Sequence, residues 1–350
     1  MPLSPANDDG VRWRATGNAP AEPEFTPALS VAVPCYNEAG VLEELYCRLT
    51  VACRAVCHDY EIVLVNDGSG DPTWDVICDL ARRDIHVIGV NLTRNRGHQI
   101  ALTAGLAHCR GDRILIIDAD LQDPPELLPR MWALMDAGAE VVYGQRHLRR
   151  GETKFKMVTA RLFYRLIRKL TDVPIAEDTG DFRLISRRVA DVFRSMPEQH
   201  RFVRGMIAWI GFPHVPIPYD RQPRFAGTTK YPLRKMVDFA FDAIFSFSTQ
   251  PLRLGLYLGL SMCALSILLI GAAVIWWLVF KPLPGWTSLM VAVLFVGGVQ
   301  TILLGVIGEY LSRLYQQSKG RPLYVVQEVV GGGRTRVELA ACASAQIRPS

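Results

Sequence analysis

Several features that mark other classes of protein are missing from this 350-residue sequence. None of its eight cysteines forms a CxxC pair, so no zinc or dithiol redox motif is indicated, and we expect reduced, buried thiols. The formal charge is +5, but lysine and arginine form no dense block, so nucleic acid is not an expected partner. Residues 1–28 contain no apolar segment of the signal-peptide kind, and we expect them to form a disordered extension.

Charged residues are also absent from two long segments near the C-terminus, Leu254–Phe280 and Trp286–Gly308. Each segment exceeds the roughly 20 residues that cross the hydrocarbon core of a bilayer. A pair of buried helices in a soluble protein is the alternative, but such helices rarely stay apolar on every face over this length. We therefore predict a transmembrane hairpin with helices at 251–281 and 286–312.

Positive charge flanks this hairpin on the side of both chain ends, at Arg234, Lys235, Arg253, Arg313, Lys319 and Arg321. The positive-inside rule predicts a multi-pass protein of the inner (cytoplasmic) membrane, with the N-terminal domain and a C-terminal tail at 313–350 in the cytoplasm. Residues 232–250 place phenylalanine and alanine at helical spacing. We expect an amphipathic helix in the membrane interface there, and packing against the soluble domain is the alternative.

Residues 29–231 have the pattern of one α/β domain, in which apolar, β-branched runs alternate with helical patterns. This alternation predicts a mostly parallel, Rossmann-like sheet covered by helices on both faces. Ligands of such sheets bind at the carboxyl ends of the strands. The expected strands are 29–33, 61–66, 86–91, 113–118 and 140–144, and the expected helices are 38–56, 72–82, 97–108 and one that begins after Pro125.

Polar clusters follow four of these strands, and the densest lies in IIDADLQDPPE. Closely packed carboxylates raise one another's pKa unless a cation lies among them, so we expect a divalent metal beside Asp118 and Asp120. Alternate residues at the end of a strand share one face, which would let Asp118, Asp120 and Gln122 converge on one ion. Asp123 stands before two prolines, and we expect it to cap the next helix.

The order of four motifs resembles that of glycosyltransferase family 2, whose members share the GT-A fold. The motifs are PCYNE (34–38), VNDGS (65–69), IDADLQDPPE (117–126) and DTGDFRL (178–184). The resemblance runs from Leu29 to Val326 and is strongest to the polyprenyl-phosphate glycosyltransferase branch, which includes dolichol-phosphate mannose synthase and bactoprenol glucosyltransferases. The QxxRW motif of the processive branch is absent from the sequence, which favours transfer of a single sugar.

The resemblance implies a binding site for a nucleotide-sugar donor, such as UDP-glucose. In that site Asp67 would contact the nucleobase, and the loop 34–38 would line the nucleoside pocket. The loop 220–232 would close over the diphosphate as a lid, and a basic linker attracted to anionic lipid is the alternative. The implied donor-binding residues are Pro34, Tyr36, Asn37, Glu38, Asp67, Asp118, Arg224 and Lys230.

The resemblance also implies a metal site and a catalytic centre. Asp118, Asp120 and Gln122 match the motif that holds Mg²⁺ or Mn²⁺ against the diphosphate, where a hard cation neutralises the charge of the leaving group. Asp120 and Asp181 are the implied catalytic residues. For Asp181 two roles are open, that of a general base and that of a residue that positions the sugar or an arginine such as Arg183.

The implied acceptor is a polyprenyl phosphate such as undecaprenyl phosphate. A phosphate monoester has a second pKa of about 6 and is largely ionised at neutral pH, so the reaction requires no general base. A single direct displacement would invert the anomeric carbon. Arginines suit the acceptor phosphate, although those near residue 161 could instead lie on a solvated or lipid-facing side of a helix. The implied acceptor residues are Arg146, Arg161, Arg201 and Arg204.

Three functions are open at this point. The first is sugar transfer to a polyprenyl phosphate, and the resemblance adds the expectation of a homo-oligomer, specifically a tetramer. The second is transfer to another membrane acceptor, for which a general base at Asp181 would be essential. The third is a membrane scaffold that binds a nucleotide-sugar without turnover, which the intact acidic motifs disfavour.

Overall fold

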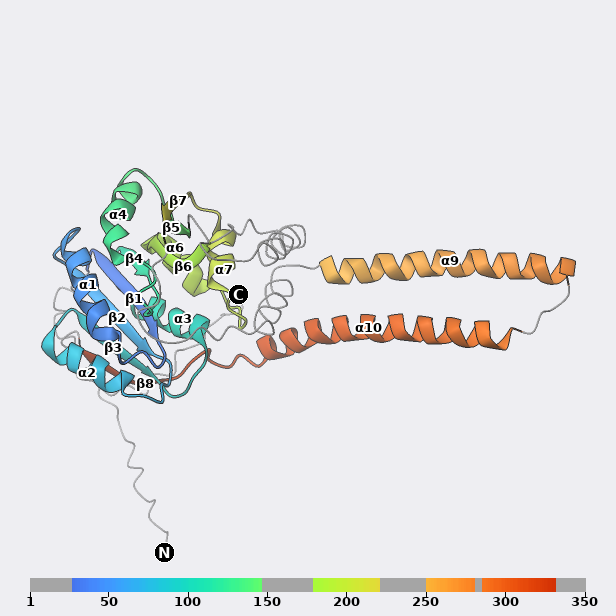
Figure 1. The fold of residues 1–350 in the computed structure, drawn as a ribbon, viewed down its shortest axis with the longest axis horizontal. Helices are drawn as coiled ribbons and strands as arrows, with labels where there is room; N and C mark the ends of the chain where they lie inside the picture. Colours follow the sequence, from blue (N-terminus) through green and yellow to red (C-terminus); the bar gives the residue numbers. More distant parts are fainter. Residues whose placement is uncertain (1–26, 147–178, 221–249, 281–284, 332–350) are drawn as a thin grey trace, which may run out of the picture.

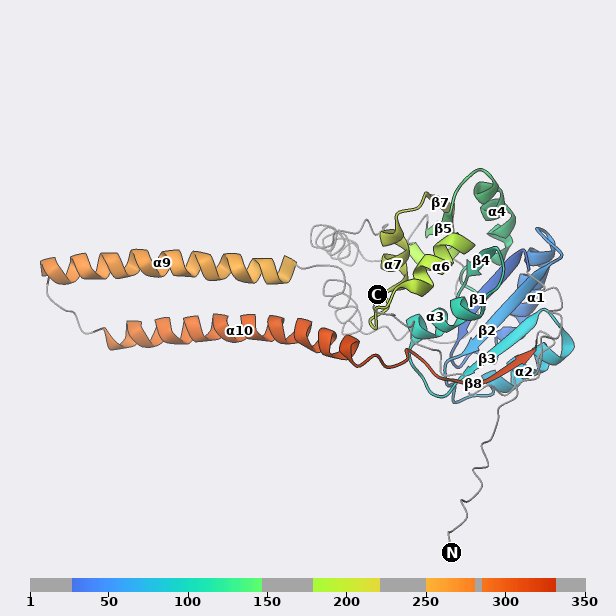
Figure 2. The same cartoon turned by 180° about the vertical axis from the view of Figure 1, so that it is seen from behind.

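The computed structural model describes residues 27–146, 179–220, 250–280 and 285–331. An α/β domain lies at one end of the molecule, and two long antiparallel helices extend away from it (Figure 1; the opposite side is shown in Figure 2). The N-terminal extension expected at 1–28 and the interfacial helix expected at 232–250 fall almost entirely outside the described residues.

The domain is built on a sheet that has eight strands within the described residues, in the order β7-β5-β6-β4-β1-β2-β3-β8. Strands β4, β1, β2 and β3 are parallel neighbours, and β6 lies antiparallel between β4 and β5. The predicted mostly parallel α/β sheet is therefore confirmed. The strands are β1 (Leu29–Cys35), β2 (Tyr60–Asn66), β3 (Val87–Leu92), β4 (Arg113–Ile116), β5 (Val141–Arg146), β6 (Thr179–Ser186), β7 (His214–Tyr219) and β8 (Val326–Gly331).

Helices cover both faces of this sheet. On one face α1, α2 and α4 pack with Val31 and Ile62, and on the other α3, α6 and α7 pack with Ala32 and Val63. Because alternate residues of a strand enter different cores, the central strands are apolar at nearly every position. The helices of the domain are α1 (Leu42–Arg54), α2 (Thr73–Arg83), α3 (His98–His108), the short turn η1 (Pro125–Leu127), α4 (Leu128–Asp136), α6 (Arg187–Ser195) and α7 (Val203–Ile210).

Two strands that the sequence pattern does not predict are β6 and β7. Asp181 and Arg183 interrupt the apolar pattern of β6, and two prolines interrupt that of β7, which suits its place at the edge of the sheet. The fourth strand also ends at Ile116 rather than at the predicted residue 118. As a result β6 carries Asp181 to the place where β4 ends.

Part of the tail expected at 313–350 has regular structure. Strand β8 pairs antiparallel with β3 and completes the edge of the sheet. Tyr324 and Val326 are 4% exposed and pack with the core beneath β3. The edge of β3 has backbone groups that require partners, and β8 supplies them. This C-terminal segment therefore belongs to the α/β domain.

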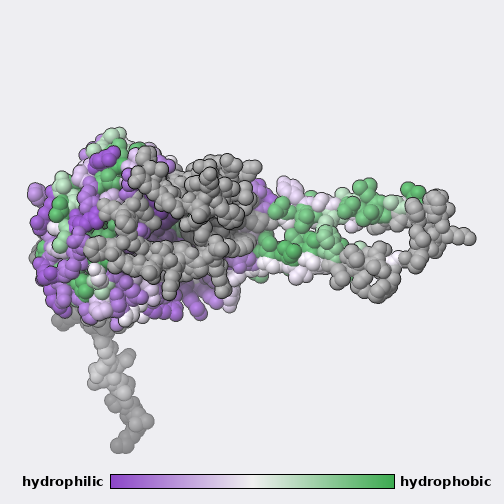
Figure 3. Space-filling view, in the orientation of Figure 1, coloured by the Kyte–Doolittle hydropathy of each residue, from purple (hydrophilic) through white to green (hydrophobic). Residues whose placement is uncertain are grey.

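Within the described residues two helices are long and apolar enough to cross a membrane, α9 (Gln250–Phe280) and α10 (Trp286–Ser318). Their bounds lie close to the predicted ones, although α10 extends six residues beyond residue 312. Large apolar side chains are open along them, such as Leu268 at 70% exposure. Figure 3 shows hydrophobic surface on both helices and mostly polar surface on the domain. An apolar surface of this extent indicates contact with lipid or another protein.

Hydrogen bonds connect the end of α10 to the domain. The side chain of Gln317 donates to the carbonyl of Pro197 (2.7 Å) and accepts from the backbone N–H of Gln199 (2.9 Å). The side chain of Gln199 donates in turn to the carbonyl of Arg321 (2.9 Å). Together with β8, these contacts hold the domain beside the base of the hairpin.

A buried carboxylate organises the opposite end of the sheet, where the parallel strands begin. Glu61 is 2% exposed, and it accepts hydrogen bonds from the Ser30 hydroxyl (2.6 Å) and from the backbone N–H of Arg110 (2.6 Å). Its second oxygen accepts from Arg110 Nη2 (2.9 Å). The side chain thus joins β1, β2 and the turn before β4.

We predict that Glu61→Ala lowers the free energy of unfolding by about 3 kcal/mol, because the buried hydroxyl of Ser30 and the partly buried donors of Arg110 lose their acceptor. Thermal unfolding of the full chain in detergent measures this effect. The control Glu43→Ala removes a carboxylate with a 57% exposed side chain on α1, and it should change stability by less than about 0.5 kcal/mol. Equal stability of the two variants would refute the structural role of Glu61.

Candidate active site at the carboxyl ends of the strands

Polar side chains gather where β1, β2, β3 and β4 end. These strands are parallel, so their carboxyl ends meet along one edge of the sheet. The antiparallel strand β6 reaches the same edge from the other direction, since Ile116 pairs with Arg183. The loops after β2 and β4 and the start of β6 therefore bring Asp67, Asp118 and Asp181 to one region.

The loop after β1 is tied to the loop after β2. Asn37 has a left-handed backbone (φ 57°), and its N–H donates to Ser69 Oγ (3.0 Å). Tyr36 is 50% exposed at the rim, and Glu38 is partly exposed beside it. Pro34 instead lies buried within β1. Of the predicted nucleoside-binding residues in this loop, the structure thus places Tyr36, Asn37 and Glu38 at the rim and Pro34 in the sheet.

Asp67 holds the start of α3 in place. Its carboxylate is 2% exposed and accepts hydrogen bonds from the backbone N–H groups of Arg96 (2.7 Å) and Gly97 (2.9 Å). Burial raises the pKa of Asp67 above its ordinary value, although these two hydrogen bonds lower it. The residue predicted to contact a nucleobase therefore also fixes the first turn of α3.

The acidic motif after β4 lies in a loop and not in a strand. Because β4 ends at Ile116 and Leu121 has a left-handed backbone (φ 58°), the expectation that alternate residues share a strand face is wrong here. The loop is instead organised by its own side chains, since the N–H of Gln122 donates to Asp120 Oδ1 (3.2 Å). Burial and the nearby carboxylates, opposed by His98, raise the pKa of Asp118 to about 6.

Asp123 does not cap the helix that follows it, contrary to the prediction. The N-cap position of η1 is Pro124, and no side chain caps it. Asp123 is 1% exposed and accepts a hydrogen bond from the hydroxyl of Tyr219 at the end of β7. The same hydroxyl accepts from Arg146 Nε (3.4 Å). Tyr219 thereby links the acidic loop to the predicted acceptor residue Arg146.

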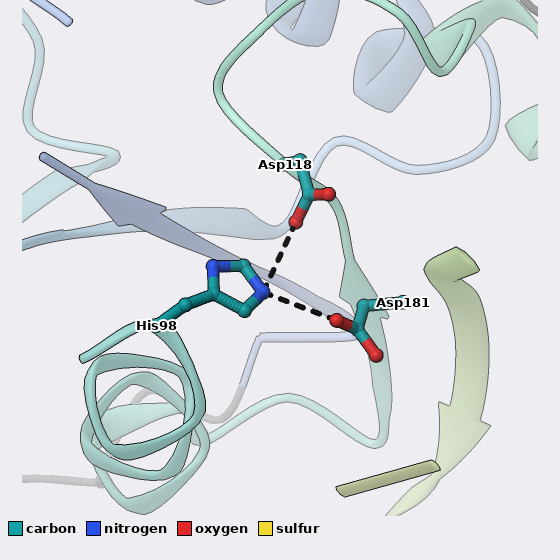
Figure 4. Close-up of side chains that lie close together, drawn as sticks. All are labelled: His98, Asp118 and Asp181. Carbon is teal, nitrogen blue, oxygen red and sulfur yellow. Dashed lines mark hydrogen bonds and ion pairs between the residues drawn. The ribbon is translucent and has the colours of Figure 1, made fainter. Parts of the chain in front are cut away.

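His98, which no sequence motif singles out, lies between two carboxylates (Figure 4). Its Nε2 atom is 3.1 Å from Asp181 Oδ2 and 3.4 Å from Asp118 Oδ1. Burial lowers the pKa of His98, but the hydrogen bond to Asp181 and the charges of both carboxylates raise it to about 9. The available signal was the position of His98 directly after Gly97, at the start of a helix on the ligand edge of the sheet.

Asp181 is surrounded by donors. It accepts hydrogen bonds from Arg204 Nε (2.7 Å), Arg204 Nη2 (3.2 Å) and Gln99 Nε2 (3.3 Å), in addition to its contact with His98. Burial alone would raise the pKa of Asp181, but Arg204 and His98 hold it well below its usual range. Arg183 donates instead to backbone carbonyls of β6. A carboxylate that stays ionised and is saturated with donors is a poor general base and a good anchor for cations.

The acidic residues of this edge fit a hard divalent cation. Within the described part of the chain, Asp118 Oδ1 is buried and accepts no hydrogen bond. One ligand atom each from His98, Asp118 and Asp181 lie within 4.8 Å of one another, close enough to surround an ion. The ion pair with Arg204 already balances the negative charge of Asp181. The negative charge that a cation would balance therefore lies on Asp118 and on Asp120, two residues further along the same loop.

The predicted acceptor arginines are divided among different roles. The guanidinium of Arg201 donates to the carbonyls of Glu198 (3.1 Å), Phe193 (3.1 Å) and Met196, contacts that join it to the end of α6. Arg204 is the partner of Asp181, and Arg146 lies at the end of β5. Three further predicted site residues fall outside the described residues, namely Arg161, Arg224 and Lys230.

Comparison with known proteins accounts for both parts of the molecule. Residues 30–193 match the glycosyl transferase family 2 model, and residues 250–314 match that of the GtrB C-terminal hairpin. The bactoprenol glucosyl transferase of Shigella phage SfV is 40% identical over 300 residues, which cover 85% of this chain and 98% of that relative. The chain belongs to glycosyltransferase family 2.

Two further relatives and one solved structure also match this chain. The uncharacterized glycosyltransferase sll0501 of Synechocystis sp. is 44% identical and covers 88% of this chain and 97% of its own length. The uncharacterized glycosyltransferase YkcC of Bacillus subtilis is 44% identical over 86% of this chain and 94% of its own length. A solved glucosyl-3-phosphoglycerate synthase of Mycobacterium tuberculosis, in complex with Mn²⁺, UDP and phosphoglyceric acid, has a TM-score of 0.40 at 20% identity and covers 63% of this chain and 76% of that one.

Membership of family 2 confirms the resemblance seen in the sequence motifs and the GT-A type expected of the α/β domain. The match to the GtrB hairpin begins at the first residue of α9 and ends within α10. The match to the relative from Shigella phage SfV covers 85% of this chain, more than the family 2 domain alone.

Proposed function

We propose that this glycosyltransferase moves one sugar from a nucleotide-sugar, UDP-glucose or a similar donor, to undecaprenyl phosphate or another polyprenyl phosphate. The observation that carries the proposal is that one chain joins a family 2 domain to an apolar hairpin over nearly the full length of relatives named bactoprenol glucosyl transferase. The acidic edge of the sheet supplies the charges that a nucleoside diphosphate and its metal require.

In this proposal Asp118, Asp120 and Gln122 hold Mg²⁺ or Mn²⁺. When bound, the ion neutralises the charge that develops on the departing nucleoside diphosphate. Tyr36, Asn37 and Glu38 border the nucleoside, and Asp67 accepts from the nucleobase while it keeps α3 in position. Burial and the neighbouring carboxylates raise the pKa of Asp118. A bound cation would relieve the repulsion among these carboxylates.

The acceptor is proposed to enter on the side of β5, near Arg146. An ionised phosphate attacks the anomeric carbon directly and inverts it, so no side chain has to remove a proton. Arg146 and the predicted residue Arg161 bring the acceptor anion toward the donor, and Arg224 and Lys230 remain the predicted lid contacts. Asp181 anchors Arg204 and His98 in this proposal, which favours the positioning role over the role of base.

The proposed location is the inner membrane. In this proposal α9 and α10 cross the bilayer, and the positive residues that flank them support a cytoplasmic position for the catalytic domain and both termini. The bonds of Gln317 and Gln199 then keep the active site close to the membrane surface, where a lipid phosphate is available. A tetramer remains a prediction of the family resemblance.

The experiment that tests the proposed function compares acceptors. Membranes that contain the protein are incubated with labelled UDP- and GDP-sugars and with undecaprenyl phosphate, undecaprenol or diacylglycerol. We expect label to enter lipid only with undecaprenyl phosphate, to stop with a chelator and to resume with Mn²⁺ or Mg²⁺. Label in diacylglycerol would favour the other class of membrane acceptor, and nucleotide binding without any transfer would favour a scaffold.

A further inference from the structure

The linker between α6 and α7, residues 196–202, is bonded to the base of the hairpin. The side-chain amide of Gln317, in the last turn of α10, donates to the carbonyl of Pro197 (2.7 Å) and accepts from the N–H of Gln199 (2.9 Å). One of these bonds requires a donor and the other an acceptor, and a side-chain amide supplies both. In both views of the molecule α7 lies on the side of the domain that faces the hairpin (Figures 1 and 2). The α6–α7 linker therefore follows the position of α10.

The same linker is folded around Arg201. The guanidinium lies 5.0 Å from the ring centre of Phe193, and it donates to the backbone carbonyls of Phe193 (3.1 Å), Met196 and Glu198 (3.1 Å). Phe202, the last residue of the linker, is 9% exposed. These contacts leave the linker little freedom to bend, so a shift at the hairpin end reaches the start of α7.

The first two residues of α7 hold Asp181. The N–H of Val203 donates to Gln99 Oε1 (2.8 Å), and Gln99 Nε2 donates to Asp181 Oδ2 (3.3 Å). Arg204 Nε donates directly to Asp181 Oδ1 (2.7 Å). Asp181 is 2% exposed, so these bonds decide where its carboxylate lies. One short stretch of chain thus joins the end of α10 to the buried carboxylate of the active site.

We propose that Gln317 is a positioning residue of the active site, which holds the α6–α7 linker and through it the contacts of Gln99 and Arg204 with Asp181. This inference rests on the proposed function, which places Asp181 at the site of sugar transfer. Side chains at such a site must be held to within about 0.5 Å, so support from a neighbouring element affects turnover. A tether that only keeps the domain near the membrane is the alternative, and it would leave kcat at saturating acceptor unchanged.

The kinetic test uses the full chain in detergent with saturating nucleotide-sugar and undecaprenyl phosphate. We expect Gln317→Ala to lower kcat about tenfold, because Asp181 and its donors lose their fixed geometry. The Kd of UDP, measured with Mn²⁺ present, should stay within about twofold, because the proposed donor residues Asp67 and Asp118 lie in other loops. The matched control is Gln316→Ala, which removes an exposed amide in the same turn of α10 and should leave kcat unchanged.

A double-mutant cycle tests whether the effect passes through the linker. Gln99→Ala removes both the acceptor of the Val203 N–H and a donor to Asp181, and we expect it to lower kcat about tenfold. If Gln317 acts through the same contacts, the double variant should lose about tenfold to twentyfold. Two independent effects would multiply to about a hundredfold.

Hydrogen–deuterium exchange gives a readout that does not depend on turnover. The N–H of Val203 is bonded to Gln99, whereas the N–H that Gln317 accepts belongs to Gln199. We therefore expect exchange at Val203 to be about tenfold faster in Gln317→Ala, because the start of α7 is no longer held, and unchanged in Gln316→Ala.

Each of three results would overturn the inference. They are an unchanged kcat in Gln317→Ala, a multiplicative loss in the double variant, and wild-type exchange at Val203 in Gln317→Ala. A higher KM for undecaprenyl phosphate at unchanged kcat belongs to the first of these and would identify a tether. A wild type that transfers no sugar to undecaprenyl phosphate would instead refute the proposed function, and exchange at Val203 would then decide whether Gln317 holds the start of α7.

Discussion

The Asp120→Asn variant is expected to transfer sugar at least about a thousandfold more slowly than the wild type, while it still folds and inserts into membranes. Asp120 Oδ1 accepts the N–H of Gln122, and the amide oxygen of asparagine can accept the same bond. The loop therefore keeps its shape, and what is lost is a negatively charged oxygen ligand for the divalent ion. The initial rate of label transfer from donor to lipid measures this loss.

Two additional measurements make the Asp120 result specific. Asp79→Asn is the matched control, because the side chain of Asp79 is 62% exposed on α2 and belongs to none of the loops that form the site, and this variant should transfer sugar at the wild-type rate. Titration with Mn²⁺ should show weaker binding by Asp120→Asn and normal binding by the control. Transfer by Asp120→Asn within a few fold of the wild type would remove Asp120 from the metal site.

The second large effect is expected for Asp181→Asn, which we predict to slow transfer by about a hundredfold. The neutral amide cannot balance Arg204 and His98, and its NH₂ group faces donors where the wild type has an acceptor. Both cations then lose their fixed positions in the site. The control Asp191→Asn removes an exposed carboxylate on α6 and should leave the rate unchanged.

The pH profile separates an anchor from a base at this position. Asp181 has a pKa held well below its usual range, so it stays ionised between about pH 5 and 8 and contributes no acid limb there. The acceptor phosphate, with a second pKa of about 6, does contribute one, and kcat/KM should fall as the pH drops through that value. In both the wild type and Asp181→Asn, kcat/KM should fall over the same acidic pH range, although its maximum is lower in the variant. Loss of that limb in Asp181→Asn would identify Asp181 as the base.

The parallel half of the sheet could be predicted from the sequence for a physical reason. Strands β1 to β3 are buried on both faces, so their apolar runs are nearly unbroken and easy to recognise. Their carboxyl ends coincide, which let polar loops far apart in the sequence, such as those with Asp67 and Asp118, be assigned to one site. The hairpin was predictable because length and lack of charge suffice to recognise it.

The remaining strands depend on contacts that no local pattern encodes. β8 forms because the edge of β3 lacks a partner, and the two segments are more than 230 residues apart in the chain. β6 carries Asp181 and Arg183 inside a buried strand, which is tolerated because Arg204, Gln99 and His98 lie opposite Asp181. Sequence spacing alone contains neither of these pairings.

The same limit applies to the individual site residues. His98 carries no motif of its own, and its role appears only when α3 brings it between Asp118 and Asp181. Arg201 has the residue type that a phosphate site requires, yet the carbonyls at the end of α6 occupy its guanidinium. Residue type thus indicates the chemistry that a site can have, and tertiary contacts decide which other groups each side chain meets.

The most direct test of the account is the mass of the lipid made by the purified, full-length protein from a nucleotide-sugar and undecaprenyl phosphate. With Mn²⁺ or Mg²⁺ present, we predict a product heavier than undecaprenyl phosphate by one hexose residue, and no product after chelation or from Asp120→Asn. A product formed equally well without a divalent metal, or a sugar attached to a lipid that has no phosphate, would contradict it.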